Sequence, residues 1–251
     1  MFSKICLLFA VVVFALGSAV AQKQGDLPLN EDINKTYQLA RGARVEVSGI
    51  AGPVEVTVSD GDTATVHIVR SAQTREDLDC YRMIVEGDGN RIEIRHEQFT
   101  QRARCGNIKA RQRVKLSVPR HIDLHLSTIA GDVSIGAVEG VVKLTKIAGH
   151  VALSGAQSAE ISSLASGLTM HIERVSARGM QIEGVAGAVE LQIGESLDAD
   201  VVVDDMLGKI VAETSRAKIS KVGDSKYRVK LGAGGAEISV TGITGNVRLS
   251  R

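Results

Sequence analysis

A short pattern of glycine and aliphatic residues recurs along this chain and limits the folds open to it. Each copy reads apolar, x, Gly, x, apolar, x, apolar, with serine in the glycine place of one copy. The copies begin at Ile50, Ile129, Val138, Ile147, Leu164, Val185, Met206 and Ile243. From residue 129 the starting points advance by 9, 9, 17, 21, 21 and then 37 positions. Steps of about twenty residues are typical of solenoids and other arrays of stacked units.

The spacing within each copy indicates its local structure. Residues two apart lie on one face of a β-strand, so each copy ends in a short strand with an apolar inward face. A glycine on the inward register allows a sharp bend, or lets a neighbouring backbone come close. A single coil of about 18 residues buries too little apolar surface to offset its ordering entropy, so coils must stack to be stable.

We therefore predict an all-β chain in which residues 126–251 form a β-solenoid of stacked short strands, with rungs of about 18–21 residues. Residues 35–125 carry strand-like segments, a hairpin loop at 86–90 and a helical turn at 73–78. We expect this N-terminal β region to resemble an antiparallel sheet and to form one continuous domain, 35–251, with the repeats. A β-sandwich is the alternative, since regular short strands also suit two packed sheets.

Residues 1–21 have the features of a secretory signal peptide. Lys4 precedes an apolar run at 5–16, and Ala19-Val20-Ala21 forms a small-x-small cleavage site. Twelve apolar residues span about 18 Å as a helix, which is short of a bilayer core of about 30 Å. We expect residues 22–34 to be a flexible tail. The mature chain is then exported to the periplasm, the cell surface or the medium, with no membrane span after cleavage.

Charge and composition argue against nucleic acid as a partner. Without Lys4, the 30 Lys and Arg residues fall to 29, which equals the 29 Asp and Glu residues. No net field then steers the chain toward a polyanion. The aromatic residues beyond the signal are Tyr37, Tyr81, Phe99 and Tyr227. Such a chain has few platforms on which bases or sugar rings stack.

The cysteines agree with export. Cys80 and Cys105 are an even pair in a chain expected to reach an oxidising compartment, so a structural disulfide is the first interpretation. They lack C-x-x-C spacing and a nearby cluster of ligand residues. We therefore expect no redox or metal role for them.

The opening segment TYQLARGARVEVSGIAGPVEVTV and the recurring IAGDVSI and IAGHVAL are similar to the bacterial putative-adhesin family. The resemblance covers most of residues 35–251. It implies an exported β-solenoid domain of the autotransporter-adhesin or head-domain kind, with an interaction role at the surface or in the periplasm. It supplies no catalytic motif to carry over.

His121, Asp123 and His125 alternate along an expected strand and would share one face. Imidazole and carboxylate groups suit zinc or a similar ion. Neighbours on one strand face are, however, about 7 Å apart, which is too wide for three ligands of one ion without bending. A solvated polar face is the favoured interpretation, and no cofactor is predicted.

A basic segment lies next to the second cysteine. Its members are Arg102, Arg104, Lys109, Arg111, Arg113 and Lys115. Arg111, Arg113 and Lys115 alternate and would line one strand face. The segment could bind polyanions such as lipopolysaccharide, or it could be a charged edge that prevents strand pairing between molecules. The neutral charge balance favours the second interpretation.

Two further features predict contacts. Asp132 and His150 hold equal places in the copies that begin at Ile129 and Ile147, so stacked coils would join them by a surface hydrogen bond or ion pair. The last strand, Asn246–Ser250, reaches the terminus without an evident cap. We expect it to be a free edge that pairs with a second copy or with a partner strand.

Taken together, these features predict an exported, non-enzymatic, adhesin-like module that binds or scaffolds at the cell envelope, with an envelope protein or polysaccharide as partner. The sequence carries neither a Gly-x-Ser-x-Gly elbow nor a catalytic-cysteine signature. One alternative is a carbohydrate-active β-helix enzyme, which would need paired carboxylates in a groove. The other is a polyanion-binding protein that uses residues 102–115.

Overall fold

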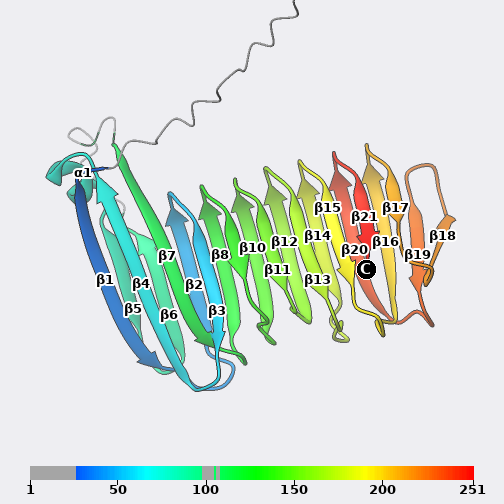
Figure 1. The fold of residues 1–251 in the computed structure, drawn as a ribbon, viewed down its shortest axis with the longest axis horizontal. Coiled ribbons are helices and arrows are strands. Elements are labelled where there is room, and N and C mark those ends of the chain that lie inside the picture. The colour runs from blue at the N-terminus through cyan, green and yellow to red at the C-terminus, as the bar shows by residue number, and fades with distance from the viewer. Residues whose placement is uncertain (1–26, 98–104, 106–107) are drawn as a thin grey trace, which may run out of the picture.

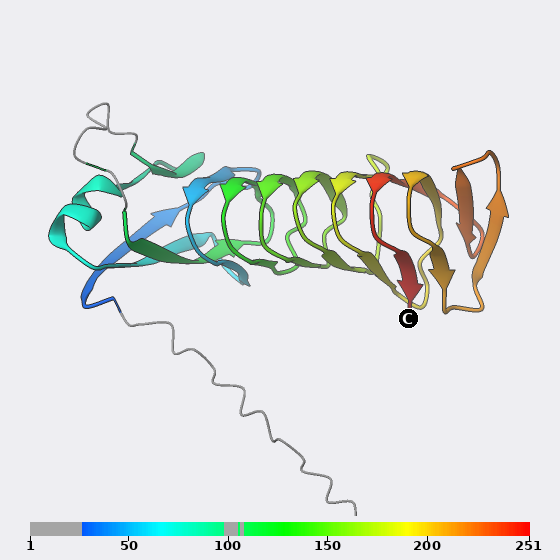
Figure 2. The same cartoon turned by 90° about the horizontal axis from the view of Figure 1, so that it is seen from above.

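The computed structural model describes residues 27–97, 105 and 108–251, and the expected signal peptide therefore lies outside the described residues. The described residues form two β-sheets, of ten and eleven strands, and one short helix. The sheets face each other along an elongated molecule (Figures 1 and 2). The prediction of an all-β chain is confirmed. Within this part of the chain, no helix is both long enough and apolar enough to cross a membrane.

Neighbouring strands in each sheet are seldom consecutive in the sequence. In spatial order, sheet A contains β1 (Leu29–Gln38), β4 (Thr63–Ala72), β7 (Ala110–Pro119), β3 (Val54–Ser59), β9 (Val133–Ile135), β11 (Val151–Ser154), β13 (Leu168–Ile172), β15 (Val189–Ile193), β21 (Val247–Ser250) and β17 (Ile210–Ala212). Sheet B contains, in the same way, β18 (Ala217–Lys221), β19 (Tyr227–Leu231), β16 (Ala199–Met206), β20 (Ala236–Ile243), β14 (Met180–Val185), β12 (Ser158–Leu164), β10 (Val141–Ile147), β8 (Asp123–Ile129), β2 (Arg44–Ile50), β6 (Arg91–His96) and β5 (Met83–Gly87). The helix is α1 (Arg75–Cys80).

From β8 to β15 the chain places successive strands alternately in sheet B and sheet A. Each strand from β8 to β13 pairs in parallel with the strand two further along the chain. In sheet B the register joins Leu124 to Val142, Val142 to Ala159 and Ala159 to Met180, and these steps match the spacing of the repeat. Sheet A repeats the same steps, and we use the word coil for one passage of the chain through both sheets.

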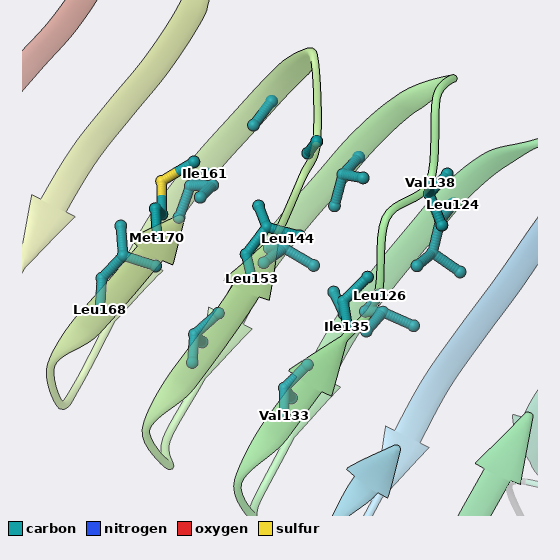
Figure 3. Packing of buried hydrophobic residues seen from close by; sticks show 14 of the residues in the cluster. Leu124, Leu126, Val133, Ile135, Val138, Leu144, Leu153, Ile161, Leu168 and Met170 are labelled. Atoms are coloured by element: carbon teal, nitrogen blue, oxygen red, sulfur yellow. The ribbon is translucent and has the colours of Figure 1, made fainter. Parts of the chain in front are cut away.

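The core lies between the sheets, and buried residues from both belong to one hydrophobic cluster. Leu124 and Leu126 of β8 face the interior, as do Val133 and Ile135 of β9, and each is at most 2% exposed (Figure 3). Since side chains alternate across a strand, the residues between them face solvent. The aliphatic triplets of the repeat supply the apolar layer of each coil.

The repeated glycine brings the corners of successive coils close together. A Cβ added to Gly149 would lie 2.3 Å from the carbonyl oxygen of Gly131, and one added to Gly131 would lie 2.3 Å from that of Gly52. Real Cβ atoms do not approach a carbonyl oxygen that closely, because the atoms would overlap. Glycine stands here because neighbouring backbone occupies the place of a side chain.

A second corner feature was not predicted. The residue before the pattern has a left-handed backbone in successive coils, with φ of 56° at Thr128, 58° at Lys146 and 59° at Ser163. Non-glycine residues seldom adopt this conformation. The conformation recurs at the same place before three successive copies of the pattern that lead from sheet B to sheet A.

The last coil lies within the stack instead of at its end. Strand β21 pairs with β15 on one side and with β17 on the other, and β20 lies between β14 and β16 in the same way. The prediction that Asn246–Ser250 is a free edge is therefore wrong. After β17 the chain forms the antiparallel hairpin β18–β19, which extends sheet B through the pairing of β19 with β16. The chain then returns between the two coils that precede this hairpin. This excursion explains the long final step of the repeat.

The N-terminal region extends both sheets. Strands β2 and β3 pair in parallel with β8 and β9, and β6 pairs in parallel with β2, so this part is not wholly antiparallel as predicted. The antiparallel pairs are β1–β4, β4–β7 and β5–β6. The predicted tail at 22–34 is wrong from Leu29 onward, because β1 pairs with the whole length of β4.

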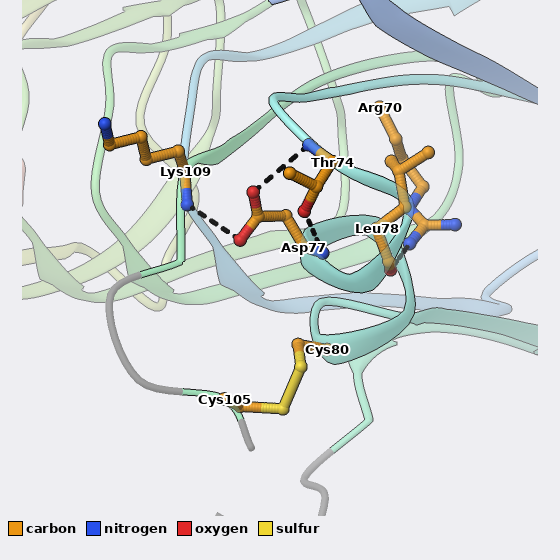
Figure 4. The surroundings of a disulfide bond; sticks show 7 residues. All are labelled: Arg70, Thr74, Asp77, Leu78, Cys80, Cys105 and Lys109. Atoms are coloured by element: carbon orange, nitrogen blue, oxygen red, sulfur yellow. Dashed lines mark hydrogen bonds between the residues drawn. A yellow bond between two sulfur atoms is a disulfide. The ribbon is translucent and has the colours of Figure 1, made fainter.

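The predicted disulfide is present and joins Cys80 at the end of α1 to Cys105, with their Cα atoms 5.7 Å apart (Figure 4). Thr74 and Asp77 form a capping box that begins the helix. Asp77 also accepts a hydrogen bond of 3.3 Å from the backbone N–H of Lys109. The helix is thereby attached to the start of β7.

Arg70 of β4 anchors α1 to sheet A. The residue is only 6% exposed, and its guanidinium group donates hydrogen bonds to the backbone carbonyls of Leu78 and of Tyr81, the latter at 3.0 Å. It also pairs with Glu31 of β1. Burial lowers the pKa of Arg70, and the nearby Glu31 opposes this effect. The arginine remains charged because its ordinary pKa is far above neutral pH.

Candidate functional site

A pocket lies on the outer face of sheet A, where the long strands β4 and β7 extend past the turn between β2 and β3. Strand β7 begins at Ala110, four residues before Val114, which pairs with the first residue of β3, Val54. Strand β4 pairs with this extension of β7, up to the pair of Ala72 with Ala110. These strand ends therefore run beside the turn that joins β2 to β3.

The pocket has a volume of about 710 Å³. One side is formed by β4 and β7, and the other by the turns that precede β3 and β9. The two turns carry Gly52 and Gly131 at equal places of the repeat, and neighbouring backbone occupies the place of a side chain at both. The lining residues are Leu27, Ala51, Gly52, Pro53, Val69, Ser71, Arg111, Gln112, Arg113, Ala130, Gly131 and Asp132.

The pocket is lined by more basic than acidic side chains, and these side chains differ in whether they have a partner. Arg111 and Arg113 are exposed, and among the described residues neither has a carboxylate within 4.0 Å. Asp132 is the one acidic residue of the lining, and its Oδ1 accepts a hydrogen bond of 2.9 Å from the backbone N–H of His150. Two guanidinium groups are thus available to an anionic ligand, whose carboxylate, sulfate or phosphate oxygens match their donor geometry.

The predicted basic segment is divided by the structure. Arg111, Arg113 and Lys115 share the exposed outer face of β7, in alternation with buried residues, as predicted. Lys115, however, pairs with Glu55 of β3 at 3.2 Å. Lys109 lies at the start of β7, next to α1, outside the pocket lining. The other two members, Arg102 and Arg104, lie outside the described residues.

Sequence reasoning missed the residues that complete the pocket around these arginines. Val69 and Ser71 enter because β4 is antiparallel to β7, with Val69 opposite Arg113 and Ser71 opposite Arg111. A signal for the two corners was present, because Gly52 and Gly131 hold the same place in two copies of the pattern. Stacked copies place such corners side by side.

His121 and Asp123 have separate partners instead of a shared ion. The Nδ1 atom of His121 lies 2.7 Å from Oε2 of Glu139. Asp123 Oδ1 accepts a hydrogen bond of 2.9 Å from the backbone N–H of Val141 in the next coil. Among the residues that the structure describes, no group of three His, Cys, Asp or Glu side chains is placed to hold a metal ion.

His125 lies in a row of charged residues on the outer face of sheet B. Its register partners are Glu46 of β2 and Lys143 of β10. Burial lowers the pKa of His125, and the positive charge of Arg44 lowers it further. The neutral form of the imidazole is therefore favoured in the folded protein.

The contact predicted between Asp132 and His150 is present as a hydrogen bond from the backbone of His150 to the Asp132 carboxylate. Asp123 makes the corresponding bond to the N–H of Val141, also across one coil. Each carboxylate satisfies a donor at the corner of the following coil. These two acidic residues therefore have a structural role.

A second pocket, of about 500 Å³, lies near the C-terminal end and contains two glutamates. Glu195 pairs with Arg251, and Glu213 lies 3.6 Å from Arg248. Retaining and inverting glycosidases need one carboxyl group that is protonated and another that is free to act. In this pocket both glutamates are instead engaged by arginines, so neither carboxylate is free of a partner.

No protein-family model matches this chain, and no curated protein matches it. Several solved structures match this chain. A putative cell adhesion protein from Clostridium sporogenes is 15% identical, covers 88% of this chain and 99% of that chain, and has a TM-score of 0.48. A putative adhesin from Bacteroides fragilis is 14% identical over 90% of this chain and 100% of that chain, with a TM-score of 0.38. A putative lipid binding protein from Parabacteroides distasonis is 10% identical, covers 87% and 94% of the two chains, and has a TM-score of 0.27.

Proposed function

We propose that this protein is an exported, non-enzymatic binding module of the cell envelope that holds an anionic polysaccharide at the Arg111–Arg113 pocket. The observation that carries the proposal is the pair of exposed guanidinium groups beside a hollow on the outer face of sheet A, without carboxylate partners among the described residues. Binding of a polyanion by residues of the basic segment is thus preferred over the interpretation of a charged protective edge.

The pocket is held by a rigid frame. Arg111 and Arg113 are two residues apart on one strand, so their Cα atoms are about 7 Å apart and their side chains leave the same face. Strand β7 is paired on both sides, with β4 and β3. A single anionic chain that runs along the strand can contact both arginines without loss of backbone freedom in the protein, which favours affinity.

The two sheets are best explained as the winding of a β-solenoid, with coils that follow the spacing of the sequence repeat. Parallel pairing between successive coils and equal steps in both sheets support this interpretation. A sandwich built from hairpins would place neighbouring strands antiparallel. The pocket is lined by residues of β4, β7 and the turns before β3 and β9. Strands β4 and β7 lie toward one end of the molecule and the hairpin β18–β19 lies at the other, so in the solenoid the stacked coils act as a spacer (Figure 2).

Export is part of the proposal. The signal-like features of residues 1–21 and the disulfide between Cys80 and Cys105 support it, because disulfides persist in oxidising compartments. Binding to an envelope polysaccharide requires the same location.

Retention on heparin beads and on immobilised lipopolysaccharide tests the proposal. We expect retention of the wild type that weakens as salt rises, because counterions compete for the arginines. The double variant Arg111→Ala/Arg113→Ala should elute at markedly lower salt. The matched control is Lys218→Ala/Lys221→Ala on β18, which removes the same charge at the other end and should elute like the wild type.

Equal retention of the two double variants would contradict the proposed site. A separate assay for new reducing ends, after incubation with acidic polysaccharides, tests the enzyme alternative. The proposal predicts no release of reducing ends above the background without protein.

A further inference from the structure

The C-terminal end of the molecule exposes apolar side chains that the other coils do not. In the described part of the chain, the large hydrophobic residues that are exposed number five, and four of them lie within 207–222. Leu207 is 82% exposed and Val222 60%, and Ile219 and Val211 are also exposed. At the place of Val211, the other coils in sheet A carry polar residues or alanine, such as Ser134, Ala152 and Glu190. This end therefore differs from the polar faces of the stack.

Strand β17 is the edge of sheet A at this end, and its partner among the described strands is β21 alone. The carbonyl of Lys209 accepts from Val247, and the N–H of Glu213 donates to Leu249, so both point toward β21. Backbone groups alternate in direction along a strand. The N–H and C=O groups of Ile210 and Ala212 therefore point out of the open edge and are available to another strand.

The sequence around this edge is complementary to itself. If two copies of β17 pair in antiparallel fashion about Val211, Ile210 of one copy lies opposite Ala212 of the other. Lys209 then lies opposite Glu213, once on each side of the two-fold axis. Directly opposite residues share a face of the sheet, and cross-strand pairs of opposite charge are favourable.

From this geometry we propose that the protein forms a two-fold symmetric dimer through antiparallel pairing of β17 with β17 of a second copy. The open backbone groups of Ile210 and Ala212 supply the hydrogen bonds, Val211 packs on its own equivalent, and the Lys209–Glu213 pairs set the register. A two-fold interface uses the same surface on both copies, which this segment satisfies. Because β17 is only three residues long, the dimer is weak and depends on concentration.

The other edge at this end is a poorer candidate. Strand β18 carries Lys218 and Lys221, and both are exposed. Lysine on an edge strand is a common device against pairing with other chains. The free edge expected at Asn246–Ser250 thus lies instead at β17.

Sedimentation velocity of the purified protein, from micromolar to near-millimolar concentration, tests the dimer. We expect the wild type to approach twice the monomer mass at the upper end. Lys209→Glu alone and Glu213→Lys alone should each weaken dimerisation by at least about fivefold, because each places like charges opposite one another twice. Glu213 also lies near Arg248, so thermal unfolding is measured to confirm that Glu213→Lys remains folded.

Two combinations make the test specific to this register. An equimolar mixture of the two single variants should dimerise, because a glutamate of one variant then meets a lysine of the other on both sides of the axis. The double variant Lys209→Glu/Glu213→Lys should dimerise like the wild type, at unchanged net charge. Lys218→Glu on β18 is the matched control and should leave the dimer unaffected.

The proposal is overturned if the wild type remains a monomer at near-millimolar concentration, or if the double variant is as monomeric as the single ones. Binding of the apolar end to anionic lipid vesicles, or to an added β-strand peptide, in a wild type that stays monomeric would assign the surface to those partners instead. A further variant, Ala212→Pro, removes an outward N–H donor and should abolish pairing without breaking a bond to β21.

Discussion

Replacing Gly149 with alanine should loosen one coil boundary, because the new Cβ has no space. It would lie 2.3 Å from the carbonyl carbon and oxygen of Gly131. Carbon atoms in contact are normally about 3.5–4.0 Å apart, so the two corners must separate by about 1.2 Å or more. The obstacle is backbone, which cannot rotate away as a side chain can. The glycine has no left-handed φ, so the effect is one of packing.

The magnitude follows from the hydrogen bonds that cross this boundary. Those nearest are Ala148 N–H to Ile129 C=O, Val133 N–H to His150 C=O, and His150 N–H to Asp132 Oδ1, each 2.9 Å long. A separation of about 1.2 Å carries them beyond the useful range of about 3.2 Å. At about 1 kcal/mol each, their loss costs about 3 kcal/mol. Overpacking of a core has a cost of the same order.

Urea unfolding followed by circular dichroism measures the effect, since the chain has no tryptophan. We expect the free energy of unfolding to fall by about 3 kcal/mol, and the Tm by about 6–12 °C. Gly61→Ala is the matched control, because a Cβ at Gly61 meets nothing within 4 Å. It should stay within about 0.5 kcal/mol of the wild type. If Gly149→Ala is as stable as Gly61→Ala, the close packing of corners does not hold the coils together.

Three further predictions concern other parts of the molecule. Replacing Cys80 and Cys105 with alanine should lower the free energy of unfolding by roughly 3 kcal/mol, measured by urea unfolding, because the unfolded chain gains freedom; no loss relative to the wild type would contradict this. Arg70→Ala should cost about 3 kcal/mol in the same assay, since it removes the hydrogen bonds of a charged donor to the carbonyls of Leu78 and Tyr81. A neutral result would show that these bonds contribute little. Because burial lowers the pKa of His125, the unfolded chain binds a proton more readily, so stability should fall as pH drops through about 6.5 and level off below the folded pKa. The urea midpoint of His125→Gln should change less over this range than that of the wild type, and an equal change would rule out a contribution from this histidine.

The repeat predicted the interior of this fold because its period and its register have direct physical meaning. Alternation placed Val133 and Ile135 in the core, and glycine on the inward register predicted the close approach of corners at Gly149. The left-handed backbone of the residues before each corner, such as Thr128 and Lys146, was not predicted, because these residue types do not favour that conformation.

The order of the coils could not be read from the repeat. The period of the repeat predicts that the copies stack, but it does not predict which copies are neighbours. The copy at Ile243 could therefore lie beside any other copy. Only the pairing shows that it lies between those at Val185 and Met206. Strand β1 was missed for a different reason. It is mostly polar, and Ile33 and Tyr37 are only partly buried against the core.

The candidate site was predicted in part. The alternation of basic residues on β7 placed Arg111 and Arg113 on one face, and nothing in the sequence separated them from Lys115, which Glu55 neutralises. The pocket itself depends on how far β4 and β7 extend past the first coil, and strand ends are poorly defined by sequence patterns. The tertiary pairing of β7 therefore decides which basic residues are available.

The register between coils, with the last coil placed inside the stack, is most directly tested by a pair of cysteine variants. Glu190 pairs with Arg248, which in turn pairs with Val211, and all three lie on the outer face of sheet A. Directly paired residues of neighbouring strands are close enough for a disulfide, whereas residues two strands apart, at about 10 Å, are not. In dilute solution under mild oxidation, we expect Glu190→Cys/Arg248→Cys to form an intramolecular disulfide and Glu190→Cys/Val211→Cys to remain reduced. The opposite result would show that the coils follow one another in sequence order, and would contradict the account.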